Sequence, residues 1–183
     1  VTLEKDPLQF FVTSTSVKVT HRDHHMYDTD SNVTIAGASS GISTTLSTSG
    51  GINASANALA IASASTFPSS ATSGTIHLKI GDEIMTGTIS GTNVTSLARA
   101  QDGTTAAIHA QGATVELYQI NNVPLTEINK THTSISNIGI DSYVITTSTQ
   151  SDTASTSGES NITATENAQM DGMQTLIPAI EHP

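Results

Sequence analysis

Apolar and polar side chains alternate along the middle of the chain. Between residues 75 and 80, the apolar Ile76, Leu78 and Ile80 are separated by polar residues. A period of two is the pattern of a β-strand with one buried face. The pair Gly81-Asp82 follows and marks a turn. We therefore predict a strand at 75–80 that reverses direction directly after it.

Three more segments continue this pattern. Residues 83–89, 94–100 and 113–120 are each predicted as strands. Ser90–Asn93 is a turn-rich cluster that would close a hairpin, and residues 101–105 interrupt the alternation. Residues 75–120 are therefore expected to form consecutive antiparallel strands in a compact β module.

The flanking chain contains shorter apolar runs. We predict further strands at 8–12, 17–19, 33–36, 59–63, 143–146 and 161–165. The first of these is the most apolar, and an exposed apolar terminal strand can add to the sheet of a neighbouring chain. Residues 39–53 are predicted to be a loop. Residues 124–130 are the best helix candidate, since a proline stands near the start and Leu125 and Ile128 lie three apart.

These elements predict a mainly β fold. We expect an antiparallel β sandwich or barrel-like module with one short helix and extended terminal segments. The expected organisation is an N-terminal strand segment (1–20), a β module (21–147), a Ser/Thr-rich flexible linker (148–160) and the start of a following segment or domain (161–183). The first residue, Val1, and the apolar residues 176–180 near the end indicate a processed chain or a fragment of a longer polypeptide.

Composition supports a weakly hydrophobic β protein. Ser and Thr together make up 54 of the 183 residues, aromatic residues are only 3%, and Trp is absent. The core must therefore be built from Ile, Val, Leu and Ala, and the small supply of large apolar side chains favours function within an oligomer. The net charge of −10 disfavours binding to nucleic acid. No apolar run approaches the roughly 20 residues of a spanning helix, so we expect no membrane partner.

Residues 21–30 contain the densest set of possible metal ligands. His21, His24 and His25 lie there among three aspartates. On a strand, His21, Asp23 and His25 would share one face. No standard metal spacing is present, however, and the chain has no cysteine. We favour a polar connection between strands and predict no metal site.

The sequence contains no pattern typical of catalysis. His77, His109 and His132 are scattered; His77 is predicted on a solvated strand face, and His109 is predicted to bind a backbone group in a tight connection. Asp82 and Glu83 are adjacent, so on a strand they point to opposite faces and cannot act as a carboxylate pair. The glycine-rich stretches lack the lysine of a phosphate-binding loop. We therefore predict no catalytic residue, no cofactor site and no enzyme activity.

Three motifs within the β module resemble a pattern that recurs in tail-fibre and baseplate proteins of tailed phages. There the pattern is IGxE(I/V), then RGxxGT, then HxxGxxV; here the corresponding segments are residues 80–84, 98–104 and 109–115. Ala100 stands at the position of the usual glycine, which predicts a difference in the tight turn after Arg99.

The resemblance extends on both sides of these motifs. Residues 122–132 with 141–143, and residues 25–37, are similar to segments of large baseplate or virion structural proteins of T4-like marine myoviruses. It covers about residues 20 to 147. It implies a structural subunit of the tail or baseplate, located in the virion and bound to other virion subunits in a homo- or hetero-oligomer.

Two other hypotheses for the function remain open. An adhesin or carbohydrate-binding β module, of a tail fibre or a cell surface, would bind a host surface glycan. Such sites usually use exposed aromatic rings, and the three tyrosines of the chain are scattered. A depolymerase would need a carboxylate pair in a groove, and no such pair is visible.

Overall fold

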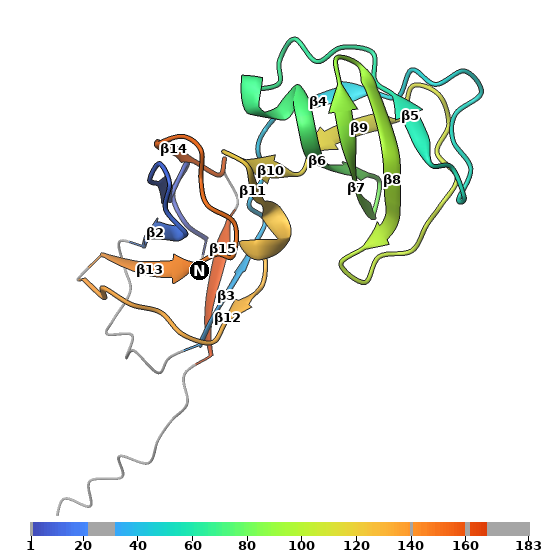
Figure 1. The fold of residues 1–183 in the computed structure, drawn as a ribbon. Helices are drawn as coiled ribbons and strands as arrows, with labels where there is room; N and C mark the ends of the chain where they lie inside the picture. Colours follow the sequence, from blue (N-terminus) through green and yellow to red (C-terminus); the bar gives the residue numbers. More distant parts are fainter. Residues whose placement is uncertain (1, 22–31, 140, 160–161, 168–183) are drawn as a thin grey trace, which may run out of the picture.

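A computed structural model describes residues 2–21, 32–139, 141–159 and 162–167, and almost every regular element in it is a β-strand. The predicted mainly β, antiparallel fold is confirmed. Figure 1 shows two lobes. The core of one lobe comes from residues 3–38 and 120–164, and the core of the other from residues 46–117. We call them the first lobe and the barrel lobe.

The barrel lobe is one curled sheet of six antiparallel strands in the order β4-β9-β6-β7-β8-β5. Its strands are β4 (Ser43–Thr45), β5 (Ala58–Ala60), β6 (Ser73–Ile80), β7 (Glu83–Ser90), β8 (Asn93–Gln101) and β9 (Thr114–Leu117). A bridge between Leu46 and Ile61 joins the chain just after each edge strand, and the Ala62 N–H donates to the Thr45 carbonyl. These bonds curl the sheet towards closure and cover its two edges.

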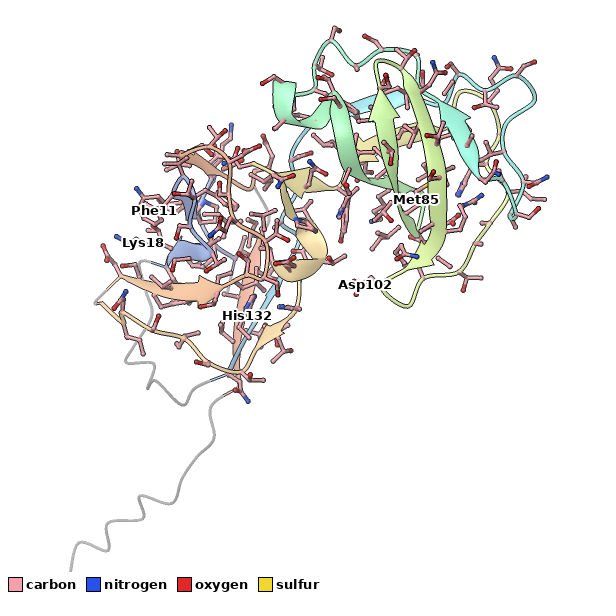
Figure 2. All side chains as sticks on the ribbon, viewed as in Figure 1. Phe11, Lys18, Met85, Asp102 and His132 are labelled. Atoms are coloured by element: carbon pink, nitrogen blue, oxygen red, sulfur yellow. The ribbon has the colours of Figure 1, made fainter. Side chains whose placement is uncertain are left out.

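The alternation seen in the sequence fills the barrel. Ile76, Leu78 and Ile80 are buried, while His77 and Lys79 between them are only partly so. Met85 points into the same core (Figure 2). The four strands predicted between residues 75 and 120 are confirmed by β6 to β9, because one apolar face per strand suffices to build this core.

Strand β8 contains two irregularities that bend it. Its pairing with β7 shifts by one residue between Ile84 and Thr86, and again between Thr86 and Thr88. Ser96 and Ala100 each have a φ of 53°. An extra residue in one strand increases local bending and twist, as a barrel requires.

The first lobe packs two smaller sheets around one core. One sheet has the order β13-β2-β1-β14: β13 (Ser142–Thr146), β2 (Ser16–Thr20), β1 (Leu8–Phe10) and β14 (Ser155–Ser157). The other has the order β12-β3-β15: β12 (Thr131–His132), β3 (Asn32–Ala36) and β15 (Thr163–Asn167). The hairpin of β10 (Gln119–Ile120) and β11 (Val123–Pro124) adds Ile120 and Val123 to the core.

The predicted helix at 124–130 is wrong. A single 3-10 turn, η2 (Leu125–Glu127), is found there, and the described residues contain a second such turn, η1 (Ser69–Ala71). Leu125 and Ile128 are both buried, as their spacing indicated. The turn cannot extend because the following strand β12 pairs with β3. The predicted loop at 39–53 also contains strand β4, and the strand predicted at 59–63 lies at 58–60.

The N-terminal strand does not offer a free edge. Strand β1 lies inside its sheet, paired with β2 on one side and β14 on the other, and Leu8 and Phe10 are buried. The expectation that this strand pairs with another chain is therefore wrong. Only the turn after it is exposed, with Phe11 at 40% and Val12 at 56% of full exposure.

The Ser/Thr-rich segment from 148 packs against the first lobe instead of acting as a free linker. It contains strand β14, and Ser151 is buried. Strand β15 adds the buried Ala164 to the same core that holds β1 and β2. The described residues therefore group differently from the predicted boundaries. The residues predicted as a lead-in, 176–180, lie outside the described part of the chain.

Candidate functional site

The most distinctive polar site is a buried carboxylate in the barrel lobe. Glu83 is the first residue of β7 and is only 1% exposed. Arg99, on the neighbouring strand β8, donates from Nε to Oε1 at 2.7 Å and from Nη2 to Oε2 at 2.7 Å. His109 Nε2 lies 2.8 Å from Oε2, so the ring must carry its proton on this nitrogen to donate. We call these three residues the Glu83 network.

Backbone groups complete the set of donors. The Ala100 N–H donates to Oε1 at 3.2 Å, and the Ala107 N–H donates to Oε2 at 3.0 Å. Burial raises the pKa of Glu83, but the hydrogen bonds from Arg99, Ala107, His109 and Ala100 outweigh it and lower that pKa to about 2. Glu83 is therefore ionised at neutral pH, and five donors use the capacity of its two oxygens.

The network ties separate loops to the barrel. Arg99 Nη1 donates to the Asn53 carbonyl at 2.6 Å, and Nη2 also donates to the Ala107 carbonyl at 2.8 Å. The backbone of His109 pairs with Ile52 in both directions. The segments around residues 53 and 107 are thus fixed on either side of the arginine.

The three motifs noted in the sequence meet at this network. The first contributes Glu83, the second Arg99 and the third His109. Thr104, at the end of the second motif, donates from its hydroxyl to the Gln101 carbonyl at 2.7 Å and accepts from the Ile84 N–H at 3.1 Å. Each of these side chains holds a backbone segment in place, which is a structural task.

The role predicted for His109 is wrong. Its ring binds the carboxylate of Glu83, whereas the prediction gave it a backbone partner. The opposite orientation of Asp82 and Glu83 agrees with the prediction, since Asp82 is exposed and Glu83 buried. The pairing of Arg99 with Glu83 was not predicted from the sequence. The sequence did contain an indication of this network, because each of the three motifs contributes one charged or ionisable residue: a glutamate, an arginine and a histidine, respectively.

His77 is not solvated, contrary to the prediction. It is half-buried, and both ring nitrogens are buried with no hydrogen-bond partner among the described residues. Its backbone N–H donates to Gln119 Oε1 at 2.9 Å. Burial lowers the pKa of His77, and the nearby Glu127 carboxylate opposes this only in part.

His77 lines a crevice between the two lobes. The crevice has a volume of about 300 Å³. Strands β6 to β8 form one wall, and β11 with η2 forms the other. We call it the inter-lobe crevice and define it by His77, Ile84, Asp102, Pro124, Thr126 and Glu127. Figure 2 places Asp102 at the end of the barrel lobe that faces η2.

The other candidate histidines lie apart. His21 is buried beside the ring of Tyr143, and His132 Nε2 lies 3.0 Å from the Ile128 carbonyl oxygen. His24 and His25 lie outside the described residues. Within the described part, no group of three or more His, Asp or Glu side chains is arranged to hold a metal ion.

Comparison with known proteins adds no relative. No family model, no curated protein and no solved structure matches the chain significantly. Among the described residues, no helix has the length and hydropathy needed to cross a membrane.

Proposed function

We propose that this chain is a structural component of a tailed-phage virion, in the baseplate or tail, and that it acts in assembly through contacts with other virion subunits. The proposal includes a location in the extracellular phage particle and no catalytic role.

One observation carries this proposal: the motifs that resemble phage virion proteins meet in the Glu83 network. Both oxygens of the carboxylate are taken by protein donors, and Glu83 is almost fully buried. A catalytic carboxylate needs access to a reacting group and spare capacity to bind it. The arrangement instead suits a rigid module whose outer surface makes the functional contacts.

Immunogold labelling of purified phage particles with antibodies against residues 32–139 tests the proposal. We expect label on the tail or baseplate of intact particles, together with peptides of this chain in their mass spectra. Particles that lack both label and peptides would overturn it. Label on cell surfaces instead would favour the hypothesis that the chain is an adhesin or carbohydrate-binding module.

A further inference from the structure

The inter-lobe crevice carries negative charge on both walls. Glu127 lies on η2 of the first lobe, and Asp102 lies on the turn that follows β8 of the barrel lobe. Burial raises the pKa of Glu127, but hydrogen bonds from Thr149 and Ser148 and the charge of Lys130 outweigh this and lower it. Glu127 is therefore ionised at neutral pH.

The floor of the crevice is apolar. Ile84 and Pro124 are buried apolar residues that line it together with the two carboxylates. An apolar floor below an anionic rim suits a ligand with an aliphatic stem and a cationic head, as Lys and Arg side chains have. A metal ion fits less well, because the described carboxylates and His77 form no group that could hold one.

No positively charged side chain among the described residues lines the crevice. None of the five Lys and Arg residues in the described part of the chain (Lys5, Lys18, Lys79, Lys130 and Arg99) lines it. The imidazole of His77 adds none at neutral pH, because burial lowers its pKa.

Three buried polar atoms with no hydrogen-bond partner among the described residues lie beside the crevice. These are both ring nitrogens of His77 and Nε2 of Gln119, whose side chain accepts from the His77 N–H. Gln119 is only 3% exposed. Gln119 Nε2 and the protonated nitrogen of a neutral His77 ring are donors, so among these atoms only the unprotonated ring nitrogen of His77 suits a cationic donor.

We propose that the inter-lobe crevice is a docking pocket for a lysine or arginine side chain of an adjoining protein subunit. The identity of that subunit as a virion protein rests on the proposed function; the pocket itself does not. A second copy of this chain is a poor source of the cation, since it has six Lys and Arg against 16 Asp and Glu, and Arg99 is held in the Glu83 network. The partner is therefore a different, basic protein.

The test is an NMR titration of the full chain with N-acetyl-arginine methylamide and N-acetyl-lysine methylamide, following the amides of Asp102, Thr126 and Glu127. N-acetyl-glutamine methylamide is the neutral control probe. We expect saturable shifts with the cationic probes at Kd values on the order of millimolar. Salt should weaken the binding, because the rim charges are partly exposed.

Matched variants locate the interaction. Asp102→Asn should weaken binding about two- to fivefold, the loss expected for one partly exposed ion pair. Asparagine tolerates the φ of 54° at this position, so the turn should be preserved. Asp82→Asn removes the same charge from the exposed turn between β6 and β7, outside the crevice, and should leave the Kd unchanged.

Several results would overturn the docking pocket. They are equal shifts with the neutral probe, equal weakening by both variants, or no saturable shift with either cationic probe. In the last case, ordered water is left as the partner of His77. These outcomes are separate from the test of the proposed function: a chain that binds the probes but is absent from virions would retain the pocket and lose the virion role.

Discussion

Ala100 has a backbone conformation that normally favours glycine. The motif pattern that residues 98–104 resemble has glycine at this position, and here an alanine has a φ of 53°. A non-glycine residue in the left-handed region is strained by about 1–2 kcal/mol. The strain is tolerated because the Ala100 N–H donates to the buried carboxylate of Glu83.

We predict that Ala100→Gly raises the free energy of unfolding. The expected gain is about 0.5–1 kcal/mol, because relief of the strain exceeds the entropy that glycine adds to the unfolded chain. Urea unfolding at pH 7 measures it. Ala98→Gly, in the same strand without a positive φ, is the control and should lower stability. A loss of stability in both variants would contradict the account of Ala100.

The Glu83 network should be essential for the barrel lobe. We predict that Glu83→Gln lowers the free energy of unfolding by about 3–5 kcal/mol, since Arg99 would be left buried without its counter-charge. The adjacent Asp82→Asn should change it by no more than about 0.5 kcal/mol, because Asp82 is exposed. Thermal and urea unfolding compare the two variants; similar losses would contradict a special role for Glu83.

Acid should weaken the protein through the same carboxylate. The pKa of Glu83 is about 2 in the folded chain and near the ordinary glutamate value of 4.5 when unfolded. The stabilisation from its charge is therefore fully present above about pH 4.5 and is lost as the pH falls towards 2. We predict that the stability difference between the wild type and Glu83→Gln shrinks across this window. A difference that stays constant from pH 7 to pH 2.5 would contradict the prediction.

At the scale of elements, the sequence predicts strands well where one face is apolar. Strands β6 to β9 have that pattern and were predicted. Strand β14 does not: Ser155–Ser157 has no apolar stripe, and it forms because its backbone pairs with the apolar β1. Composition alone therefore indicated a linker. The helix at 124–130 failed for a related reason, since pairing of β12 with β3 ends it after one turn.

The site was only partly predictable for physical reasons. The motifs identified the segments that contain Glu83, Arg99 and His109. They could not indicate that Arg99 donates to the carbonyls of Asn53 and Ala107, because backbone carbonyls are the same at every residue. The solvation of His77 was misjudged because the neighbouring lobe covers the outer barrel face at this point.

Strands β14 and β15 should be required for the first lobe but not for the barrel lobe. We predict that truncation after residue 147 removes the dispersed amide signals of the first lobe and leaves those of residues 43–117. The physical reason is that β14 pairs with β1 and β15 adds Ala164 to the first core, whereas the barrel core contains no residue after Leu117. Two-dimensional NMR of the truncated chain measures this. An unchanged first lobe would contradict the prediction.

At the scale of the molecule, two cores in one chain leave few large apolar side chains exposed. Among the described residues these are Phe11, Val12 and Ile108. Phe11 lies on the side of the first lobe that faces away from the barrel lobe (Figure 2). An adjacent exposed Phe and Val have the apolar character of a subunit contact.

We predict that Phe11→Asp blocks incorporation into particles and leaves the fold intact, because Phe11 contributes to the surface and not to either core. Thr13→Asp is the matched control, since it adds a charge to the same exposed turn and keeps the apolar pair. Complementation of a particle lacking the wild-type chain, with circular dichroism of each purified variant, measures both effects. Normal incorporation of Phe11→Asp would exclude this contact.

A cryo-electron microscopy reconstruction of the intact phage tail tests the central claim most directly. We predict density for the first lobe and the barrel lobe within the tail or baseplate. Neighbouring subunits should contact Phe11 and Val12, and a basic side chain should enter the inter-lobe crevice. A reconstruction with density for neither lobe, or with the chain free of subunit contacts at the outer surface, would contradict the account.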